Sequence, residues 1–423
     1  MSLSYDDLRS AVAGEGVGVR SRIELEPLGG PGDKVFPPTY GVPDNARTRY
    51  ALEHRVVMGA DGTRREDVQS VVLDSVSSQA NRFELALLSA LYDKKLHAPV
   101  TVVDFAGQGL FGIGRISDYE APHRIFDALL RDSVDGDDPF RHGAIGRSIT
   151  DATPGNAAAL FHHSPHTLVF GGWDSTGPKG GRGAKYERAL TSEIVAHDIQ
   201  LGVKTGSRLD PVGIELKAGP VYEAAGAFGW TTDEDEAVRD DKGKAKLYAR
   251  SGDRPGRPSQ LNHGNVTPSI DDKAGGVTAG RIVGTTVLSF IQLRRLRFPT
   301  DAAGQPVDAG SRSAVADAAR TALAALGLAA TVLAYETGFD LRSRCVLVPT
   351  APLSLDLVSR AGATTTVELD GDAALALVAE ASGRAAEVGF AWRVGELALR
   401  PTDRLVTLIR KSQDIAVAGE SDS

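Results

Sequence analysis

The sequence predicts a large globular fold that mixes β-strands and α-helices and joins them by long loops. Of the 423 residues, 42% are apolar, which is enough to bury a sizeable core. The chain also contains 47 Gly and 21 Pro residues, and their wide spread divides it into many short elements. Dividing the length by about 150 residues per domain gives a prior of two to three domains.

Strand and helix patterns alternate through the first half of the chain. Residues 14–43 are rich in glycine and proline, so we expect an irregular ordered loop there after one short strand. Short apolar runs predict strands at 22–25, 71–75, 100–105 and 167–171. Apolar residues at helical spacing predict helices at 81–92, 122–130 and 186–196.

The second half continues in the same way. We expect strands at 284–291, 346–348 and 405–409, and helices at 315–326 and 373–386. The most hydrophobic stretch is 314–335, but Asp317 and Arg320 interrupt it. The remainder is shorter than the roughly 20 residues that a membrane span needs, so we expect a buried helix that runs into a strand.

Residues 231–279 differ from the rest of the chain. An acidic run at 233–236 is followed by Lys242, Lys244 and Lys246, and apolar residues are few, which predicts a projecting or partly disordered insertion. From Lys242 to Arg297 there are eleven Lys or Arg and three Asp residues, a net charge of +8, which leaves −16 for the rest. This separation of charge favours a polyanion groove; a solvated polar insertion is the alternative on charge alone.

The composition also excludes several classes of protein. The single cysteine, Cys345, rules out an intrachain disulfide framework and a cysteine-based zinc cluster. The first residues lack the basic-then-apolar order of a secretory signal, so we expect a cytoplasmic protein. The net charge of −8 means that a polyanion would have to bind at a local patch.

Motifs for catalysis are weak. The G-x-G-x-x-G match at 107–112 follows a strand, but no helix opens within it. The loop 177–185 lacks the Lys-Ser/Thr ending of a Walker loop, and His162, His163 and His166 have no nearby cysteine or close carboxylate to complete a metal site. We therefore expect a binding protein and not an enzyme, with no cofactor and no metal.

Glycines and cations in the loop 177–185 suit a phosphate group, although a solvated loop is the alternative. Polar clusters also stand where helices begin or strands end, and each residue of these clusters is as well suited to cap a helix as to bind a ligand. They lie at 79–82, 123–124, 207–208 and 262–265.

Five long motifs occur together in this chain. They are DSVSSQANR at 74–82, APHR at 121–124, FGGWDSTGPKGG at 170–181, KTGSRLDP at 204–211 and NHGN at 262–265. As a set they resemble the RAMP-superfamily CRISPR backbone subunit, the Cas-seven type, of the type I-G (formerly I-U) Cascade effector complex. The resemblance runs from about Arg20 to about Val358.

This resemblance implies an α+β fold. The expected palm is a modified RNA-recognition (ferredoxin-like) domain with an antiparallel sheet, helices packed on it and large inserted loops. Residues 1–230 and 280–358 would form the discontinuous palm, 231–279 an inserted thumb or finger, and 359–423 a C-terminal extension of unknown role.

The resemblance also implies a non-catalytic role. Copies of such a subunit polymerise head to tail along CRISPR RNA and present the guide for pairing with target DNA, beside other subunits of the complex and without a membrane. Two alternatives stay open. One is an RNA-cleaving subunit that uses an acid such as Asp33 or Asp74, and the other is a stand-alone single-stranded RNA-binding protein.

The residues expected to bind RNA are cations, histidines and amides of these motifs and of the arginine cluster after the strand at 284–291. Trp173 is a weaker candidate, with core packing as the favoured role. The predicted RNA-binding residues are Arg82, His123, Arg124, Lys179, Arg182, Lys185, Arg208, Asn262, His263, Asn265, Arg294, Arg295 and Arg297.

Overall fold

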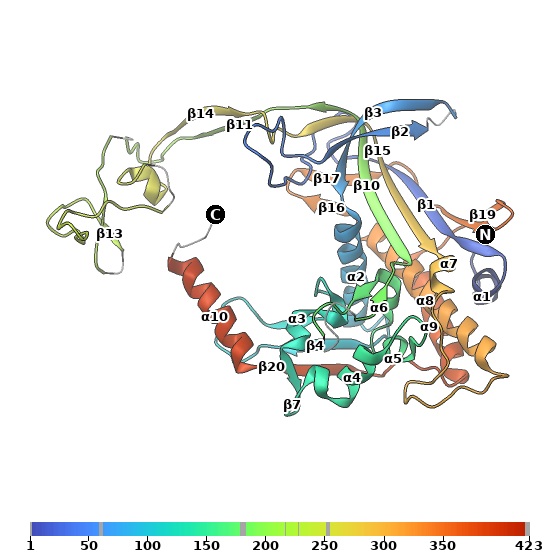
Figure 1. Ribbon diagram of the computed structural model, residues 1–423. Coiled ribbons are helices and arrows are strands. Elements are labelled where there is room, and N and C mark those ends of the chain that lie inside the picture. The colour runs from blue at the N-terminus through green and yellow to red at the C-terminus, as the bar shows by residue number, and fades with distance from the viewer. Residues whose placement is uncertain are drawn as a thin grey trace. The chain divides into compact units, whose positions relative to one another are not determined.

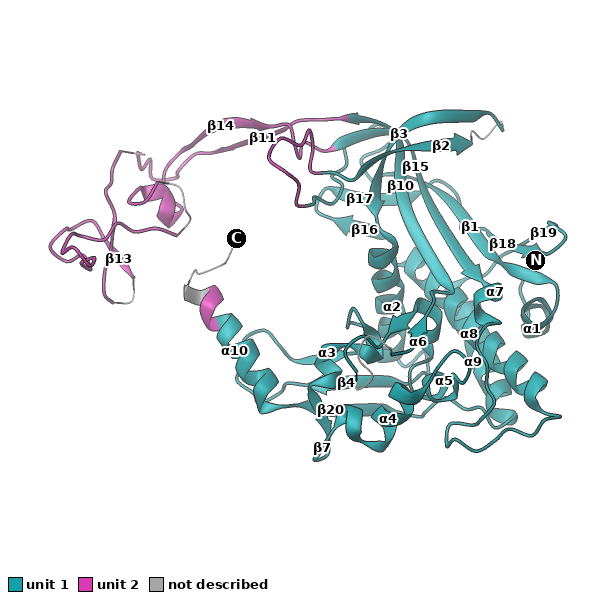
Figure 2. Cartoon of the chain, viewed as in Figure 1, with its two compact units in different colours: residues 1–40, 50–200, 277–413 teal, residues 41–49, 201–276, 414–423 magenta. Residues whose placement is uncertain are grey.

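The computed structural model describes residues 2–58, 62–177, 183–215, 217–226, 228–250 and 254–418 (Figure 1). These residues form two compact units (Figure 2). Unit 1 comprises 1–40, 50–200 and 277–413, and unit 2 comprises 41–49, 201–276 and 414–423. The boundary at 201 lies earlier in the chain than residue 231, where the sequence changes character.

The centre of unit 1 is an antiparallel sheet with the strand order β17-β1-β15-β10. Helix α2 lies in sequence between β1 and β10, and helix α8 lies between β15 and β17. This β-α-β-β-α-β order is that of a ferredoxin-like domain, so the predicted α+β class is confirmed. The bounds are β1 Gly16–Pro27, α2 Val76–Tyr92, β10 Leu190–Leu201, β15 Val277–Ser289, α8 Arg312–Glu336 and β17 Cys345–Pro349.

Five further strands extend this sheet. The hairpin of β2 and β3 joins β10, the single strand β16 joins β17, and the pair β18–β19 joins β1. The pairing of β1 with β15 sets Ile23 opposite Gly284, and along β1 buried residues such as Ile23 alternate with exposed ones such as Arg22. The added strands are β2 Leu52–Met58, β3 Arg64–Asp74, β16 Phe339–Arg342, β18 Leu355–Ser359 and β19 Thr364–Val367.

Helix α8 is the core helix of unit 1 and packs against α1, α2, α6 and α9. Among the described residues it is the one helix whose length and composition would suit a membrane span, but 89% of its apolar window is buried inside the protein. That burial is typical of the core helix of a soluble protein. The strand predicted at its end is instead helix. The other bounds are α1 Tyr5–Ala13, α6 Pro165–Phe170 and α9 Gly371–Glu387.

A second sheet of unit 1 has the order β5-β4-β20-β6-β7. Here β4 and β20 are parallel, although they lie far apart in sequence. The strands are β4 Val100–Asp104, β5 Arg115–Ser117, β6 Ser133–Asp135, β7 Asp138–Pro139 and β20 Glu396–Pro401. Short helices connect these elements: α3 Ala128–Arg131, α4 Ala144–Asp151, α5 Ala158–His163 and α7 Phe290–Leu293, with single 3-10 turns at Arg124–Phe126 and Phe140–His142.

Three predicted elements have the opposite type in the structure. The expected strand at 167–171 is the end of helix α6, the expected helix at 186–196 is largely strand β10, and the expected strand at 405–409 lies in helix α10, Asp403–Ala418. Strand β10 lies between β15 and β3, and most of its side chains are buried. Its apolar residues Leu190, Ile194, Val195 and Ile199 do not alternate regularly with polar ones, so the sequence pattern does not distinguish this strand from a helix.

Other helices differ in their bounds. Helix α2 begins at Val76 because the Ser75 hydroxyl accepts a hydrogen bond from the backbone of Ser78. The helix expected at 122–130 is instead a 3-10 turn followed by the single turn α3, with Asp127 capping the latter.

Unit 2 has little core of its own. The apolar residues buried among its described residues are Val221 and Ala237. Its strands form two-stranded ribbons, β11 Lys204–Arg208 with β14 Val266–Asp271 and β12 Tyr222–Glu223 with β13 Trp230–Thr231, and a 3-10 turn covers Pro258–Leu261. Every residue of β14 is exposed. The low content of apolar residues in this region explains why unit 2 buries little apolar surface.

Candidate nucleic-acid interface

Three of the sequence motifs in unit 1 meet at one pocket of about 380 Å³, which we call the motif pocket. Helix α2 contributes its first turns, the segment 122–124 forms one wall, and the hairpin of β8 Gly172–Trp173 with β9 Lys185–Tyr186 forms another. The side chains of chemical interest are Ser77, Asn81, His123, Trp173, Lys185 and Arg188. None of the described lining residues carries a carboxylate, so the pocket suits an anion.

Two glycines allow these segments to approach each other. Gly171 has a φ of 84°, a conformation that other residues rarely adopt. A Cβ atom on Gly172 would lie only 2.8 Å from the Thr167 Cγ2 atom and 2.9 Å from the Phe126 Cδ2 atom. The Gly-Gly pair of the motif is therefore required for the close packing behind the pocket.

The hairpin presents an aromatic ring beside a cation. Trp173 and Lys185 are paired across β8 and β9, and the Lys185 Nζ atom lies 5.8 Å from the centre of the Trp173 ring. Trp173 is 48% exposed, so core packing is not its role. An exposed indole next to an ammonium group offers a stacking surface and a phosphate contact within one site.

Arg188 and His123 complete the polar lining. One Arg188 nitrogen donates a hydrogen bond of 3.4 Å to the Ser77 hydroxyl, which ties the β9–β10 connection to helix α2. Burial, followed by the nearby charge of Arg124, lowers the pKa of Arg188. His123 is exposed and also lines the pocket.

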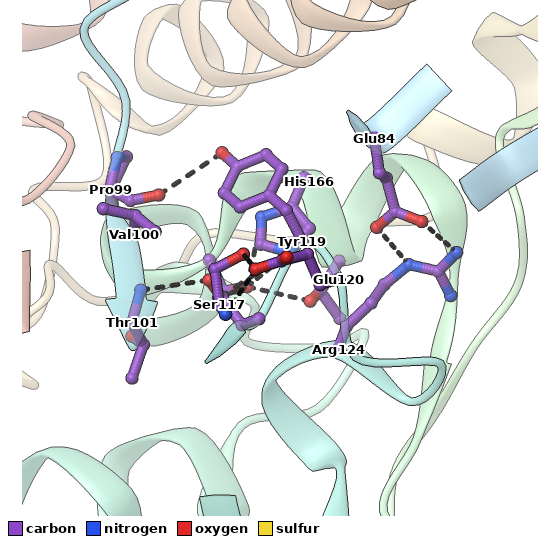
Figure 3. Close-up of polar contacts among 12 residues, drawn as sticks. Glu84, Pro99, Val100, Thr101, Ser117, Tyr119, Glu120, Arg124 and His166 are labelled. Atoms are coloured by element: carbon purple, nitrogen blue, oxygen red, sulfur yellow. Dashed lines mark hydrogen bonds and ion pairs between the residues drawn. The ribbon is translucent and has the colours of Figure 1, made fainter. Parts of the chain in front are cut away.

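Arg124 lies in the core beneath the motif pocket. Its Nε and Nη2 atoms donate to both carboxylate oxygens of Glu84 at 2.6 and 2.7 Å, and Nη1 donates to the Gly171 carbonyl at 3.0 Å (Figure 3 draws the Glu84 pair). Burial raises the pKa of Glu84, and the Arg124 charge opposes that rise. The guanidinium of Arg124 is thus used inside the protein, where it joins α2 to the glycine pair.

A buried polar network supports the segment 117–124 from behind (Figure 3). The Asp118 carboxylate accepts hydrogen bonds from the Thr101 backbone at 3.0 Å and the Ser164 hydroxyl at 3.2 Å. Tyr119 stacks on His166 with ring centres 3.8 Å apart. Burial raises the pKa of Asp118 to about 7 and lowers that of His166 to about 3. These groups position the wall that carries His123.

Asp174, directly after Trp173, belongs to a second buried pair. The Asp174 Oδ2 atom is 3.1 Å from an Arg141 nitrogen, and both side chains are almost fully buried. A Cβ on Gly183 would lie 1.9 Å from the Asp174 carbonyl oxygen, so glycine is needed where the loop returns. Lys179 and Arg182, two of the predicted phosphate contacts, lie outside the described residues.

Two other predicted arginines bond to the protein itself. Arg82 donates to the Asp74 carboxylate at 2.9 Å and to the carbonyls of Asp340 and Leu341. Arg294 donates to carbonyls at and beyond the end of α1, including that of Val12 at 2.8 Å. Both guanidinium groups join chain segments that are far apart in sequence.

The two remaining predicted arginines of unit 1, Arg295 and Arg297, are exposed. Arg295 forms an ion pair with Glu187 at the surface. Arg297 is exposed and has no ion-pair partner among the residues that the structure describes. Neither lines the motif pocket.

The predicted residues of unit 2 cluster around Asp210. The Asn265 Oδ1 atom accepts a hydrogen bond from the Asp210 backbone at 2.7 Å, and Arg208 donates to the Gly264 carbonyl at 3.1 Å. His263 lies 3.8 Å from the Asp210 carboxylate, and Asn262 caps a 3-10 turn with a φ of 58°. The Gly264 N–H bonded to Asp210 lowers the pKa of this carboxyl. The motif thus stabilises its own loop.

Sequence reasoning missed Ser77, Tyr186 and Arg188 as lining residues of the motif pocket, and it left Asn81 open between a helix cap and a ligand contact. Ser77 and Asn81 stand inside a motif that we had singled out, and helical spacing from Ser77 to Asn81 places them on one face of α2. Arg188 lies three residues after Lys185, but the helix predicted at 186–196 did not place its side chain beside that of Lys185.

The comparison with known families agrees with this geometry. A search of curated proteins found no match. Residues 19–201 match the family described as CRISPR-associated protein GSU0053, and this stretch contains every lining residue of the motif pocket. Over these 183 of its 423 residues, the chain is similar to a family of CRISPR-associated proteins.

Proposed function

We propose that this chain is a non-catalytic backbone subunit that binds CRISPR RNA in a Cascade-type effector complex. The observation that carries the proposal is the convergence of three motifs on one pocket with an exposed Trp173 beside Lys185 and Arg188. Proteins that hold single-stranded RNA without reading its sequence combine cations for the phosphates with aromatic rings for the bases.

The finer details of this role come from the resemblance of the motifs to type I-G backbone subunits. Copies of the chain would follow one another head to tail along the guide, because heterologous contacts that do not close into a ring build an open helix. Target DNA would be read by pairing with the guide while the protein holds the RNA backbone. Such a complex would assemble in the cytoplasm with other subunits.

The surroundings of Asp74 favour binding over RNA cleavage. This carboxylate is fully buried and accepts hydrogen bonds from Gln79 at 2.7 Å, Arg82 at 2.9 Å and Arg342 at 3.3 Å. A general acid or base must reach its substrate within hydrogen-bond distance. Asp74 therefore acts as a link between α2, β3 and β16. Asp33 is exposed in a loop and bonds to the backbone of Lys34.

The test is to co-express the chain with its CRISPR locus, purify it, sequence the bound nucleic acid and measure the size of the particle. Uniform CRISPR-derived RNA in a multi-copy particle is the expected result. A variant with Lys185→Glu and Trp173→Ala should lose the RNA, whereas the control Arg384→Glu on α9 should keep it. A bare monomer without RNA would refute the proposal, and a monomer with assorted RNA would favour a stand-alone RNA-binding protein.

A further inference from the structure

A smaller cavity of about 200 Å³, which we call the side pocket, shares Lys185 and Tyr186 with the motif pocket. The two pockets are therefore adjacent at strand β9. Apolar side chains of Pro154, Leu168 and Leu296 form part of its wall, and helix α7 contributes Gln292. A strand of nucleic acid with a phosphate on Lys185 would have its adjacent sugar within reach of this cavity.

Gln292 has an unused hydrogen-bonding atom. Its backbone N–H is bonded to the Ser289 hydroxyl at 3.2 Å, but its side-chain Oε1 atom is buried and has no partner in the described part of the chain. Buried polar atoms in native proteins are nearly always paired, so the Gln292 oxygen points to a missing partner.

We propose that the side pocket receives a ribose of the bound strand and that Gln292 bonds to its 2′-hydroxyl, which selects RNA over DNA. This inference rests on the proposed RNA-binding function. A guide differs in sequence from one position to the next, so an amide that reads a base edge would be unpaired with most nucleotides. The 2′-hydroxyl is the same on every nucleotide of RNA and is absent from DNA.

The chemistry of the two groups also matches. A hydroxyl both donates and accepts, and it can therefore donate to the amide oxygen of Gln292 and accept from its nitrogen. Lys185 binds RNA and DNA phosphates equally, so the selection would come from the side pocket alone.

The experiment titrates the full chain, at one salt concentration, with unstructured single strands of one sequence made as RNA, DNA and 2′-O-methyl RNA. We expect RNA to bind about tenfold more tightly than either of the others, the value of one well-placed hydrogen bond. Gln292→Met should abolish this preference by weakening RNA binding while DNA binding stays the same. The control Gln305→Met changes an exposed glutamine and should keep the preference.

The possible outcomes separate this inference from the function on which it rests. Equal binding of RNA and DNA by the unmodified chain, or a preference that survives in Gln292→Met, would overturn the inference and leave RNA binding intact. No binding of any strand would overturn the proposed function itself. If Gln292→Met fails to fold, the affinities of the unmodified chain for the three strands still test the inference. The unmodified chain must bind both DNA and 2′-O-methyl RNA more weakly than RNA.

Discussion

The Arg124 guanidinium and the Glu84 carboxylate meet in the core as a two-bonded ion pair, with Nε to Oε1 at 2.6 Å and Nη2 to Oε2 at 2.7 Å. The third arm of Arg124 reaches the Gly171 carbonyl. One buried side chain therefore connects helix α2, the segment 122–124 and the glycine pair, which are the three parts that form the motif pocket.

Removing one partner of this pair should be costly. Glu84→Gln leaves the Arg124 charge buried without a counter-charge, and we expect the free energy of unfolding to fall by about 3–5 kcal/mol, as measured by urea denaturation. The double variant Glu84→Leu with Arg124→Met removes both charges and should recover much of that loss. A loss below about 1 kcal/mol in Glu84→Gln would mean that the pair is not needed for stability.

A phosphate contact by Lys185 should be visible in the salt dependence of RNA binding. Lys185→Met removes one cation, and we expect the slope of log affinity against log salt for single-stranded RNA to become shallower by about 0.7. Arg384→Met serves as the control, because Arg384 is an exposed cation on α9 that pairs with Glu380 and Glu387. The same slope in both variants would remove Lys185 from the interface.

Trp173 should contribute by stacking, which depends little on salt. We expect Trp173→Ala to weaken binding of single-stranded RNA by about 1–3 kcal/mol at every salt concentration, and Trp173→Phe to retain most of the affinity. Because the indole is 48% exposed, the melting temperature should change little. Equal affinities of the Ala variant and the unmodified chain would contradict a stacking role.

The sequence predicted the mixed fold and the segments of the site, but not the role of each residue. The motifs at 121–124 and 170–181 were singled out from the sequence, and both line the motif pocket. They contribute His123, the Gly171-Gly172 pair and Trp173. Arg82 and Arg124 belong to the same motifs, yet their partners come from residues distant in sequence, such as Leu341 and Gly171. No local pattern distinguishes an arginine that binds a ligand from one that binds a carbonyl in the core.

The errors in secondary structure have a similar origin. Residues 190–201 form a strand that pairs with β15 and β3, and their apolar residues do not show the regular alternation expected of a strand. Residues 403–418 form a helix although the apolar run at 405–409 is short and rich in β-formers. The pairing of β10 with strands distant in sequence cannot be read from a local pattern.

His163 should make the fold sensitive to acid. Its side chain is buried, its Nδ1 atom has no hydrogen-bond partner among the described residues, and burial lowers its pKa from 6.5 to about 4, with help from the charges of His162 and Arg393. Protonation therefore favours the unfolded chain. The stability that this neutral histidine contributes is complete above pH 6.5 and is lost as the pH falls toward 4.

At pH 5 this single group should lower the free energy of unfolding by about 2 kcal/mol relative to pH 7.5, since each pH unit between the two pKa values is worth about 1.4 kcal/mol. Asp118 acts in the opposite direction, because its pKa is raised to about 7 and its protonation in the fold stabilises the protein as the pH falls.

We therefore compare His163→Leu with the unmodified chain by urea denaturation at both pH values, so that Asp118 contributes equally to each. The variant should lose less stability on acidification, while His142→Leu, at an exposed histidine, should behave like the unmodified chain. Identical pH dependence in His163→Leu and the unmodified chain would show that His163 is not held neutral in the fold.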